Sequence, residues 1–438
     1  MVNKILLIGS GAREHAIAKA LKKSDAKIET FCLASSFNPG IAKVCSEMLV
    51  ENFNNVDKVI KYSKEKSISL VIIGPENPLA AGLTNHFYIE NIKVVGPKKE
   101  LARIETSKSF ARDLLKKYKI PGCPKYKTFN SMTGVGSFLT ELGNHFVIKF
   151  DGLAGGKGVK VAGEHLSDHA DAIGYCKKIV DAGGLFVVEE KFVGEEFSLM
   201  SFCDGKTLKH MPAIQDHKRA HEGDTGPNTG GMGTYSDKDH SLPFLKKTEI
   251  QEAQNINVLV SEALKKECGE GFKGILYGGF MATSEGVKVI EYNARFGDPE
   301  AMNILSVLET DFFDICEAIT MGTLDKIDIK FKNKATVCKY AVPKGYPDNP
   351  VIGMPIYVND SPASLGEYFF ASVGLKNGNL VELGSRTLAA VGVGNTISEA
   401  EKIAEQKIKT VEGPLFHRKD IGTKKVIEKR IRHMNELR

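Results

Sequence analysis

The sequence predicts a multidomain protein of mixed α/β and α+β class. It has an N-terminal parallel α/β domain, a central α+β region with a glycine-rich flap, and a small β-rich C-terminal cap. The length of 438 residues corresponds to about three domains of roughly 150 residues each. Short apolar runs alternate with amphipathic segments over residues 4–97, which is typical of a parallel sheet with crossover helices. Residues 329–438 change to short strand-like runs separated by turns.

The composition is that of a folded protein without a marked charge. Hydrophobic residues make up 42% and charged residues 26%, which excludes wholesale disorder. The net charge of +5 is too small to indicate binding to nucleic acid or membranes. No apolar stretch approaches the ~18 residues of a membrane span, and the first apolar run is shorter than a secretory signal of roughly 7–15 apolar residues. The eight cysteines form no C-x-x-C pair, so a reduced, cytoplasmic protein is expected.

The N-terminal segment alternates strand and helix candidates. Short apolar runs predict strands, and amphipathic runs between them predict helices; the strands are expected at 4–9, 28–34, 70–76 and 93–97 and the helices at 12–24, 55–67 and 80–91. Right-handed crossovers then give a parallel sheet. Ligands bind such sheets at the carboxyl ends of the strands, where Gly9, Gly74 and Gly96 stand.

The remaining chain divides at Pro121, Gly122 and Pro124, which end a helix predicted over 101–118. Later helices are expected at 165–182, 246–268, 299–321 and 398–411, and strands within 145–162 and at 185–193, 275–283, 286–294, 336–342, 356–358 and 387–393. The predicted organisation is an N-terminal substrate domain (1–104), a linking helix (105–121), a lid (122–193), a central body (194–328) and a cap (329–438).

The first glycine turn, GSGAREH (9–15), lies between a strand and a helix N-terminus, an arrangement that attracts anions. It fails as a dinucleotide fingerprint, because Glu14 stands where the third glycine belongs and no acidic residue follows the next strand. A small molecule bearing a phosphate fits better, with Arg13 as its guanidinium partner. A tight turn without a ligand is the alternative.

The second glycine-rich loop, DGLAGGKGV (151–159), follows Lys149. Its glycines permit close approach of the backbone to phosphate oxygens, and the lysines supply point charges. It is not a Walker A loop, since Gly158 occupies the Ser/Thr position. A flexible hairpin without a ligand is the alternative interpretation.

Acidic residues end two later strands. Glu189 to Glu196 could offer backbone groups to a purine and a carboxylate to a ribose, although an ordinary charged strand end is the simpler interpretation. Alternation along 286–294 puts Glu291 and Asn293 on one face. Their oxygens suit Mg²⁺ held partly by phosphates, and Arg295 on the same side could stabilise negative charge during phosphoryl transfer. A surface cluster of ion pairs is the alternative.

The polar block QDHKRAHEGDTGPNTGGMGTYS (215–236) is too long for a mere connection, which favours a functional role. The pairs His165/His169 and His217/His221 have i, i+4 spacing but lack the Glu of H-E-x-x-H. Zinc is therefore not expected.

Taken together, these blocks resemble the phosphoribosylamine–glycine ligases (glycinamide ribonucleotide synthetases) of the ATP-grasp superfamily. The resemblance runs nearly end to end, and the block from Gln215 to Gly233 is its most specific part. It is carried by GSGAREHA, GPENPL, KFDGLAGGKGV, QDHKRAHEGDTGPNTGGMG, NARFGDPE and HRKDIG. It implies ligation of glycine to 5-phosphoribosylamine with ATP, through glycyl phosphate, in purine biosynthesis.

The resemblance also implies roles for individual residues. Arg295, Lys218 and Asp216 would act in catalysis, and Glu291 and Asn293 would bind Mg²⁺ or Mn²⁺. ATP would be held by Lys108, Lys149, Gly152, Gly155, Gly156, Lys157, Gly158, Glu189, Lys191, Val193 and Glu196. Phosphoribosylamine and glycine would be bound by Gly11, Arg13, Glu14, Glu76, Asn228, Thr229 and Gly230. The expected partners are these small molecules, with no nucleic acid and no membrane, and the expected state is a monomer.

The sequence departs from the family pattern at a few positions. Ala12 replaces a glycine of GSGGREH, Gly155 replaces an alanine, and Ala294 stands where cysteine is frequent. The strand 277–281 lacks the acidic residue found before the metal-binding Glu in many ATP-grasp enzymes. Two other interpretations stay open: an ATP-grasp ligase or carboxylase acting on another carboxylate, and a nucleotide-binding protein without turnover.

Overall fold

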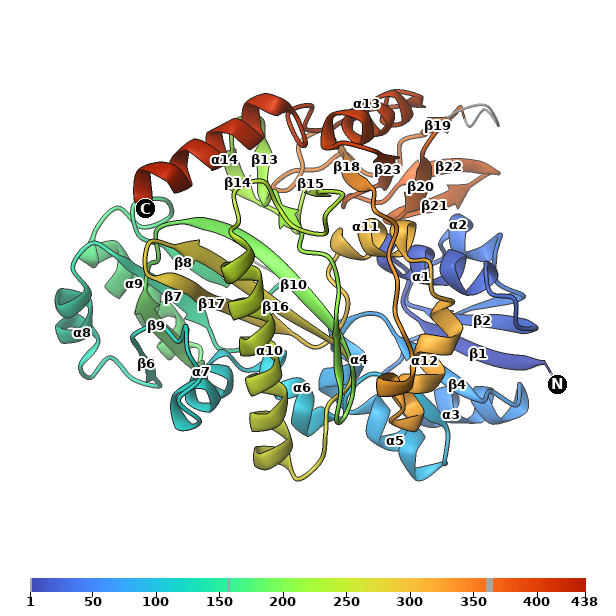
Figure 1. Cartoon of the computed structure of the whole chain (residues 1–438), viewed down its shortest axis with the longest axis horizontal. Coiled ribbons are helices and arrows are strands. Elements are labelled where there is room, and N and C mark those ends of the chain that lie inside the picture. The colour runs from blue at the N-terminus through green and yellow to red at the C-terminus, as the bar shows by residue number, and fades with distance from the viewer. Residues whose placement is uncertain (1, 156–157, 360–364) are drawn as a thin grey trace.

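The computed structural model describes residues 2–155, 158–359 and 365–438. Figure 1 shows the N-terminal domain at one end of the molecule, the lid at the other and the body between them, with the C-terminal cap along one side. None of the helices in these three described ranges is long and apolar enough to cross a membrane.

The N-terminal domain is a five-stranded parallel sheet of order β3-β2-β1-β4-β5. Its strands are β1 (Asn3–Ile8), β2 (Ile28–Ala34), β3 (Glu47–Val50), β4 (Leu70–Ile73) and β5 (Lys93–Val95). The helices are α1 (Ala12–Lys22), α2 (Pro39–Ala42), α3 (Val56–Glu65), α4 (Glu76–Ala81) and α5 (Leu83–Ile89). The residues of β1 from Ile5 to Ile8 are fully buried, because helices cover both faces of a parallel sheet. The predicted parallel sheet is confirmed.

Two short helices link this domain to the lid, α6 (Lys99–Thr106) and α7 (Lys108–Lys117). The lid is an antiparallel sheet of order β6-β9-β7-β8 with two helices. It comprises β6 (Tyr126–Phe129), α8 (Val135–Leu142), β7 (Phe146–Phe150), β8 (Val159–Val161), α9 (His169–Asp181) and β9 (Phe186–Glu190). The lid has a core of its own, which includes Phe138, Phe146 and Phe186. The predicted hairpin around the glycine-rich loop is confirmed by the pairing of β7 with β8.

The body is a second antiparallel sheet of order β11-β10-β16-β17. Its strands are β10 (Glu195–Asp204), β11 (Leu208–His210), β16 (Lys273–Thr283) and β17 (Gly286–Asn293). The helices α10 (Lys247–Cys268) and α12 (Phe312–Met321) pack against this sheet, whereas α11 (Glu300–Val307) packs against α1 and the cap sheet, and η1 (Leu324–Lys326) follows α12. Their buried side chains belong to the large core that also includes the N-terminal sheet.

The cap sheet takes two strands from the polar block. Its order is β12-β15-β18-β23-β20, with β12 (Gln215–Asp216), β15 (Gly233–Ser236), β18 (Ala335–Pro343), β23 (Leu388–Gly394) and β20 (Glu367–Phe370). Between β12 and β15 lies the hairpin of β13 (Arg219–His221) and β14 (Thr225–Asn228). The remaining elements are β19 (Tyr357–Val358), β21 (Val373–Lys376), β22 (Asn379–Glu382), α13 (Ile397–Ile408), β24 (Val411–Glu412), β25 (Leu415–Phe416) and α14 (Lys424–Leu437).

Three helices that the sequence predicts as continuous are interrupted, and that part of the prediction is wrong. The predicted helix 80–91 breaks at Gly82, whose φ of +84° is left-handed. The predicted helix 101–118 breaks at Ser107, which is extended and whose hydroxyl accepts a hydrogen bond from the Phe110 amide. The predicted helix 299–321 breaks before Asp311, whose carboxylate caps α12. Each break is a local capping arrangement that the apolar periodicity does not reveal.

Candidate functional site

The candidate residues from the lid and the body gather where the lid sheet meets the carboxyl end of β17. A narrow pocket lies there between β10, β16 and β17. Asp216 reaches it from β12, and Lys218 reaches it from the segment that follows β12. It is lined by Glu196, Phe197, Ser198, Asp216, Lys218, Tyr277, Gly279, Phe280, Ile290 and Glu291. Four of these residues, Glu196, Asp216, Lys218 and Glu291, are candidates from the sequence.

Glu291 is the electrostatic centre of this pocket. Burial alone would raise the pKa of its carboxyl, but Lys218, Lys149, Lys108 and Arg295 together hold that pKa below its ordinary value. The carboxylate is therefore ionised at neutral pH and surrounded by positive charge. In the adjacent strand β16, Gly279 lies opposite Glu291 and Tyr277 lies opposite Asn293, so this strand supplies no second carboxylate beside them.

Lys149 and Glu189 form a buried ion pair beneath the pocket. Arg112 on α7 completes it, with Nε 2.7 Å from the Glu189 carboxylate. Both cations also donate to the carbonyl oxygen of Ile290. Lys149 Nζ lies 2.8 Å from this oxygen, and Arg112 Nη2 lies 2.6 Å from it. Burial would raise the pKa of Glu189, but Arg112 and Lys149 lower it. The carboxylate of Glu189 is thus occupied by protein cations, and sequence reasoning missed Arg112.

The lid hairpin is tied to the linking helices. Lys108 at the start of α7 donates from Nζ to the carbonyl oxygen of Gly152 at 2.6 Å. Within the hairpin, the Phe150 amide donates to the carbonyl oxygen of Gly158 at 2.8 Å. A Cβ added to Gly155 would meet nothing within 4 Å, so one side of the loop is open. Gly156 and Lys157, both predicted to hold ATP, lie outside the described residues.

The predicted adenine-site residues lie at the far end of β9. Lys191 Nζ is 3.1 Å from the Glu164 carboxylate and 3.1 Å from the carbonyl oxygen of Ala162. Val193 is half exposed. Glu196, at the start of β10, pairs with Lys218 at 3.2 Å, and this carboxylate raises the pKa of Lys218.

Asp216 carries a buried oxygen, Oδ1, for which the described residues offer no hydrogen-bond partner. Burial and the nearby Glu300 raise the pKa of this carboxyl well above its ordinary value, although Lys218 and Arg386 oppose the shift. An unpaired buried oxygen is costly, and this one belongs to a residue that lines the pocket. It is therefore available to a ligand.

The loop after β14 folds back onto Lys218. The Thr229 hydroxyl donates to the carbonyl oxygen of Lys218 at 2.9 Å, and the Thr229 amide donates to the same oxygen at 2.7 Å. Asn228 lies 3.5 Å from the ring of His165 on the lid. Gly230, which follows, is exposed. These three predicted substrate residues are thus brought beside Lys218.

Arg295 is held by two carboxylates from the N-terminal part of the chain. Its Nη2 lies 2.9 Å from Glu105, and its Nε lies 3.4 Å from Glu76. Glu105 also accepts a hydrogen bond from the Ala294 amide at 2.7 Å. Burial raises the pKa of Glu105 even so. Sequence reasoning placed Glu76 in the site but missed Glu105.

The first glycine turn, residues 9–15, contacts the segment after β17 that carries Arg295. The Gly11 amide and Arg13 Nε both donate to the Glu14 carboxylate, each at 2.6 Å. Arg13 Nη1 also donates to the carbonyl oxygen of Phe296 at 3.1 Å. The guanidinium of Arg13 is buried and joins the N-terminal domain to the segment that carries Arg295.

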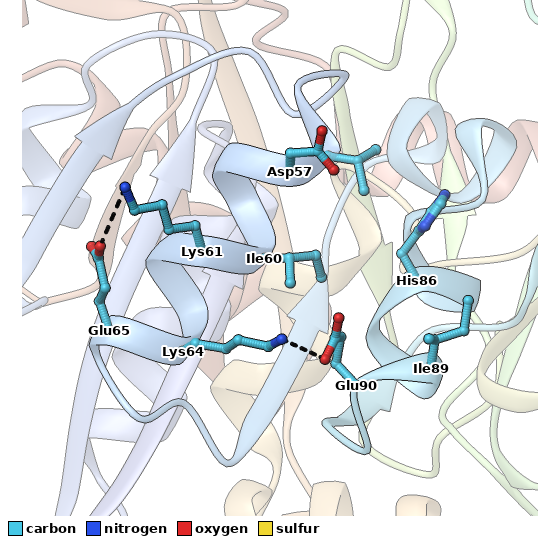
Figure 2. Close-up of a pocket in the computed structure, with 9 residues that line it drawn as sticks. Asp57, Ile60, Lys61, Lys64, Glu65, His86, Ile89 and Glu90 are labelled. Carbon is cyan, nitrogen blue, oxygen red and sulfur yellow. Dashed lines mark ion pairs between the residues drawn. The ribbon is translucent and has the colours of Figure 1, made fainter.

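Another pocket lies apart from this cluster. Figure 2 shows a surface pocket between α3 and α5, lined by residues such as Lys64, Glu90 and Ile89, none of them a predicted site residue. The predicted histidine pairs bond mainly to backbone groups, as His169 does to the carbonyl oxygen of Gly143 at 2.7 Å. Across the described ranges no group of three His, Cys, Asp or Glu side chains is placed to hold a metal ion.

Three family descriptions match the chain in succession. Residues 3–105 match "Phosphoribosylglycinamide synthetase, N domain" and residues 106–301 match its "ATP-grasp (A) domain". Residues 336–424 match its "C domain". The order of these matches follows the N-terminal domain, the lid with the body, and the cap.

Whole-chain comparisons agree with these matches. The chain is 49% identical to a phosphoribosylamine–glycine ligase of Methanosarcina barkeri, over 99% of this chain and 100% of that one. It is 50% identical to that of Methanocaldococcus jannaschii, over 99% and 100%. Among solved structures, the phosphoribosylamine–glycine ligase of Thermotoga maritima matches with a TM-score of 0.80 and 28% identity, over 95% of this chain and 99% of that one.

A biotin carboxylase domain of Hydrogenobacter thermophilus 2-oxoglutarate carboxylase matches with a TM-score of 0.70 and 15% identity, over 99% of this chain and 94% of that one. At this identity the likeness concerns the fold alone. The relatives of about 50% identity extend over the full chain and carry one name. The chain therefore belongs to the phosphoribosylamine–glycine ligase family, ATP-dependent ligases of the ATP-grasp class that act in purine biosynthesis.

Proposed function

We propose that this chain ligates glycine to 5-phosphoribosylamine, giving glycinamide ribonucleotide, ADP and phosphate, through a glycyl phosphate intermediate. The observation that carries the proposal is the convergence of Lys108, Lys149, Lys218 and Arg295 on Glu291, beside a glycine-rich hairpin. A site built this way binds several phosphate oxygens and a cation together, which is what phosphoryl transfer requires.

The reaction has two steps. A carboxylate oxygen of glycine attacks the γ-phosphorus of ATP, and the bond from that phosphorus to the β–γ bridging oxygen breaks, which releases ADP. The amine nitrogen of phosphoribosylamine then attacks the carbonyl carbon of glycyl phosphate. The bond from that carbon to the phosphate oxygen breaks, phosphate leaves, and the nitrogen loses one proton. The protein mainly orients the reactants and neutralises charge.

ATP is assigned to the cleft between the two antiparallel sheets. Lys108 and Lys149 are placed to contact its phosphates, with the loop from Gly152 to Gly158 above them. Lys191, Val193 and the backbone at Glu189 are assigned to the adenine, and the exposed carboxylate of Glu196 to the ribose. An acyl phosphate is lost to water unless the site is shielded, and we assign that role to the hairpin as a mobile lid.

Magnesium is assigned to Glu291 and Asn293. The ionised carboxylate of Glu291 and the amide oxygen of Asn293 are hard ligands of the kind that Mg²⁺ takes, and its remaining positions are usually filled by phosphates and water. In the described residues no group of three His, Cys, Asp or Glu side chains is placed to hold a metal ion, which fits an ion held partly by phosphates. Held by Glu291 and Asn293, such an ion would supply positive charge that neutralises the phosphates. Mn²⁺ has the same ligand preference.

The three residues assigned to catalysis act at different points. Arg295, fixed by Glu105 and Glu76, faces the transferring phosphoryl group and stabilises its charge. Lys218 neutralises the departing phosphate. Asp216, whose buried Oδ1 has no hydrogen-bond partner among the described residues, accepts the proton that the attacking amine loses. Gly11, Arg13, Glu14, Asn228, Thr229 and Gly230 are assigned to the two acceptor substrates.

A monomer in the cytoplasm is the proposed state of the protein. All eight cysteines are unpaired in the structure, which fits a reducing compartment. The candidate residues come from the N-terminal domain, the lid, the body and the polar block of this one chain. The site as assigned therefore needs no second copy.

The test is an assay for ADP and phosphate with ATP, Mg²⁺, glycine and phosphoribosylamine, in which each component is left out in turn. The proposal predicts ADP only in the complete mixture, together with glycinamide ribonucleotide detected by mass spectrometry. Phosphate release with bicarbonate but not with glycine would instead identify a carboxylase. Tight NADH binding without ADP formation would identify a dinucleotide-binding protein.

A further inference from the structure

Three domains of the chain meet at Asp298, in the loop that follows Arg295. Tyr340 on the cap strand β18 donates from its hydroxyl to the Asp298 carboxylate at 2.7 Å. From the N-terminal domain, Gly11 approaches the same carboxylate, since a Cβ on Gly11 would lie 3.7 Å from Asp298 Oδ2. One wall of the candidate site is therefore formed by the cap.

Arg386, just before the cap strand β23, makes most of the contacts in this wall. Its Nη1 donates to the carbonyl oxygens of Gly230 at 2.5 Å, Gly231 at 3.2 Å and Asp298 at 2.9 Å. The same nitrogen lies 3.3 Å from the Asp298 carboxylate. The guanidinium also stands 4.6 Å from the centre of the Tyr340 ring, a favourable cation–π arrangement.

The contacts of Arg386 extend to Asp216 through the turn formed by Gly230 and Gly231. Gly231 has a left-handed φ of +106°, and a Cβ there would lie 2.7 Å from Asp216 Oδ1. The loop backbone thus packs directly against the unpaired oxygen of Asp216. Because Arg386 holds the carbonyls on both residues of this turn, it fixes the loop against that oxygen. Its positive charge also opposes the rise in the pKa of Asp216.

We propose that Arg386 is a positioning residue of the ligase site, supplied by the cap, which locks the Gly230–Gly231 turn and Asp298 around the acceptor-substrate pocket. The proposal rests on the function proposed above. Arg386 itself does not line the pocket of Glu196 and Glu291, and its contacts reach that pocket only through the turn that packs on Asp216. Its loss therefore affects the second step and the binding of glycine and phosphoribosylamine more than the binding of ATP.

The test compares Arg386→Met and Arg386→Lys with the unaltered enzyme in steady-state assays that vary one substrate at a time. Methionine keeps an unbranched apolar stem, shorter than that of arginine, and removes every hydrogen bond. We expect kcat/KM for phosphoribosylamine to fall by up to roughly 10²-fold, the scale of a small misplacement of reacting groups. ATP binding, measured by calorimetry with a non-hydrolysable analogue, is expected to stay within about twofold. Lysine restores the charge and one hydrogen bond, so the activity of Arg386→Lys is expected to lie between that of Arg386→Met and that of the unaltered enzyme.

Two further variants separate positioning from folding. Tyr340→Phe removes only the hydroxyl that contacts Asp298, and we expect a smaller loss in the same parameter. Arg103→Met is the matched control, because Arg103 also stacks on an aromatic ring, 4.1 Å from the centre of Phe110, but lies outside the site; its kinetics are expected to be unchanged.

Normal phosphoribosylamine kinetics in Arg386→Met would overturn the proposal, and so would a loss confined to ATP binding. If Arg386→Met does not fold, an unchanged Tyr340→Phe enzyme would overturn it instead. An unaltered enzyme that forms no ADP from the complete mixture would refute the proposed function itself, which keeps the two failures distinct.

Discussion

Glu105 and Arg295 form a buried ion pair that joins helix α6 to the loop after β17, with 2.9 Å between Glu105 Oε1 and Arg295 Nη2. The pair fixes the guanidinium that the mechanism assigns to the transferring phosphoryl group. Glu105 also accepts a hydrogen bond from the Ala294 amide, so one carboxylate holds both the backbone and the side chain of this segment.

Glu105→Gln is predicted to lower kcat by more than it changes ATP binding. The amide keeps the shape of the side chain but removes the charge opposite Arg295, and breaking a buried pair costs roughly 3–5 kcal/mol. Glu267→Gln is the control, because Glu267 pairs with Lys117 at 2.6 Å on the surface. Steady-state kinetics with thermal unfolding would measure both variants. An active Glu105→Gln enzyme would show that Arg295 needs no such partner.

Glu291→Ala is predicted to abolish ligation while the protein stays folded. The variant removes the carboxylate assigned to Mg²⁺, while Lys149 keeps its ion pair with Glu189 and Lys218 keeps its ion pair with Glu196. Titration with Mn²⁺, followed by electron paramagnetic resonance in the presence of ADP, would measure the loss of metal binding. Glu285→Ala on the turn of the same hairpin is the control, since Glu285 only pairs with Lys288 at 3.3 Å. Near-normal turnover of Glu291→Ala would refute the metal assignment.

Arg13→Ala is predicted to raise KM for phosphoribosylamine more than KM for ATP. Arg13 braces Glu14 and the carbonyl of Phe296, so its loss disturbs the glycine turn assigned to that substrate. Initial rates with each substrate varied separately provide the measurement. A rise in KM for ATP alone would mean that the turn belongs to the nucleotide site.

Glu405→Gln is predicted to weaken the cap in a pH-dependent way. Glu405 accepts from the fully buried Lys339 at 2.8 Å and from His417 at 3.1 Å. Burial would raise the pKa of Glu405, but these partners lower it from 4.5 to about 2. A carboxyl with a lowered folded-state pKa stabilises the fold above its unfolded pKa, and this stabilisation is lost as the pH falls through the folded value.

The difference in unfolding temperature between the unaltered protein and Glu405→Gln should therefore be largest near neutral pH. It should shrink as the pH falls from about 4.5 towards 2. Glu428→Gln serves as the control, because its exposed pair with Lys424 at 3.6 Å is expected to contribute little at any pH. A difference that stays constant over this pH range would contradict the assigned cause.

The sequence predicts the elements well where burial is continuous. Strand β1 from Ile5 to Ile8 reads as a single apolar run, and both faces of that strand are covered. The breaks at Gly82, Ser107 and Asp311 were missed because they depend on single residues and their caps. The entry of β12 and β15 into the cap sheet was missed too, since Thr234 pairs with Cys338 across about a hundred residues of chain, a contact that no local pattern encodes.

The residues of the candidate site also divide into those that the sequence predicts and those that it does not. Residues within motifs, such as Glu291 and Arg295, could be named from the sequence because residue types suited to phosphate chemistry stand there at a regular strand spacing. Their supporting partners Arg112, Glu105 and Arg386 could not, because each comes from a distant element and matters through its contacts. The only local sign is that Arg112 lies next to Phe110 and Ala111 on the buried face of α7, where an arginine needs a partner.

We propose that a triphosphate binds between the hairpin of residues 152–158 and the Glu291–Asn293 edge of β17, with glycine beside it. The most direct measurement is a crystal structure of the full chain with a non-hydrolysable ATP analogue, Mg²⁺ and glycine. We expect phosphate density within contact of Lys108 and Lys149, and a metal ion on Glu291 and Asn293. Nucleotide density beside Gly9 and Gly11, with the cleft at Glu291 closed by protein side chains, would contradict it.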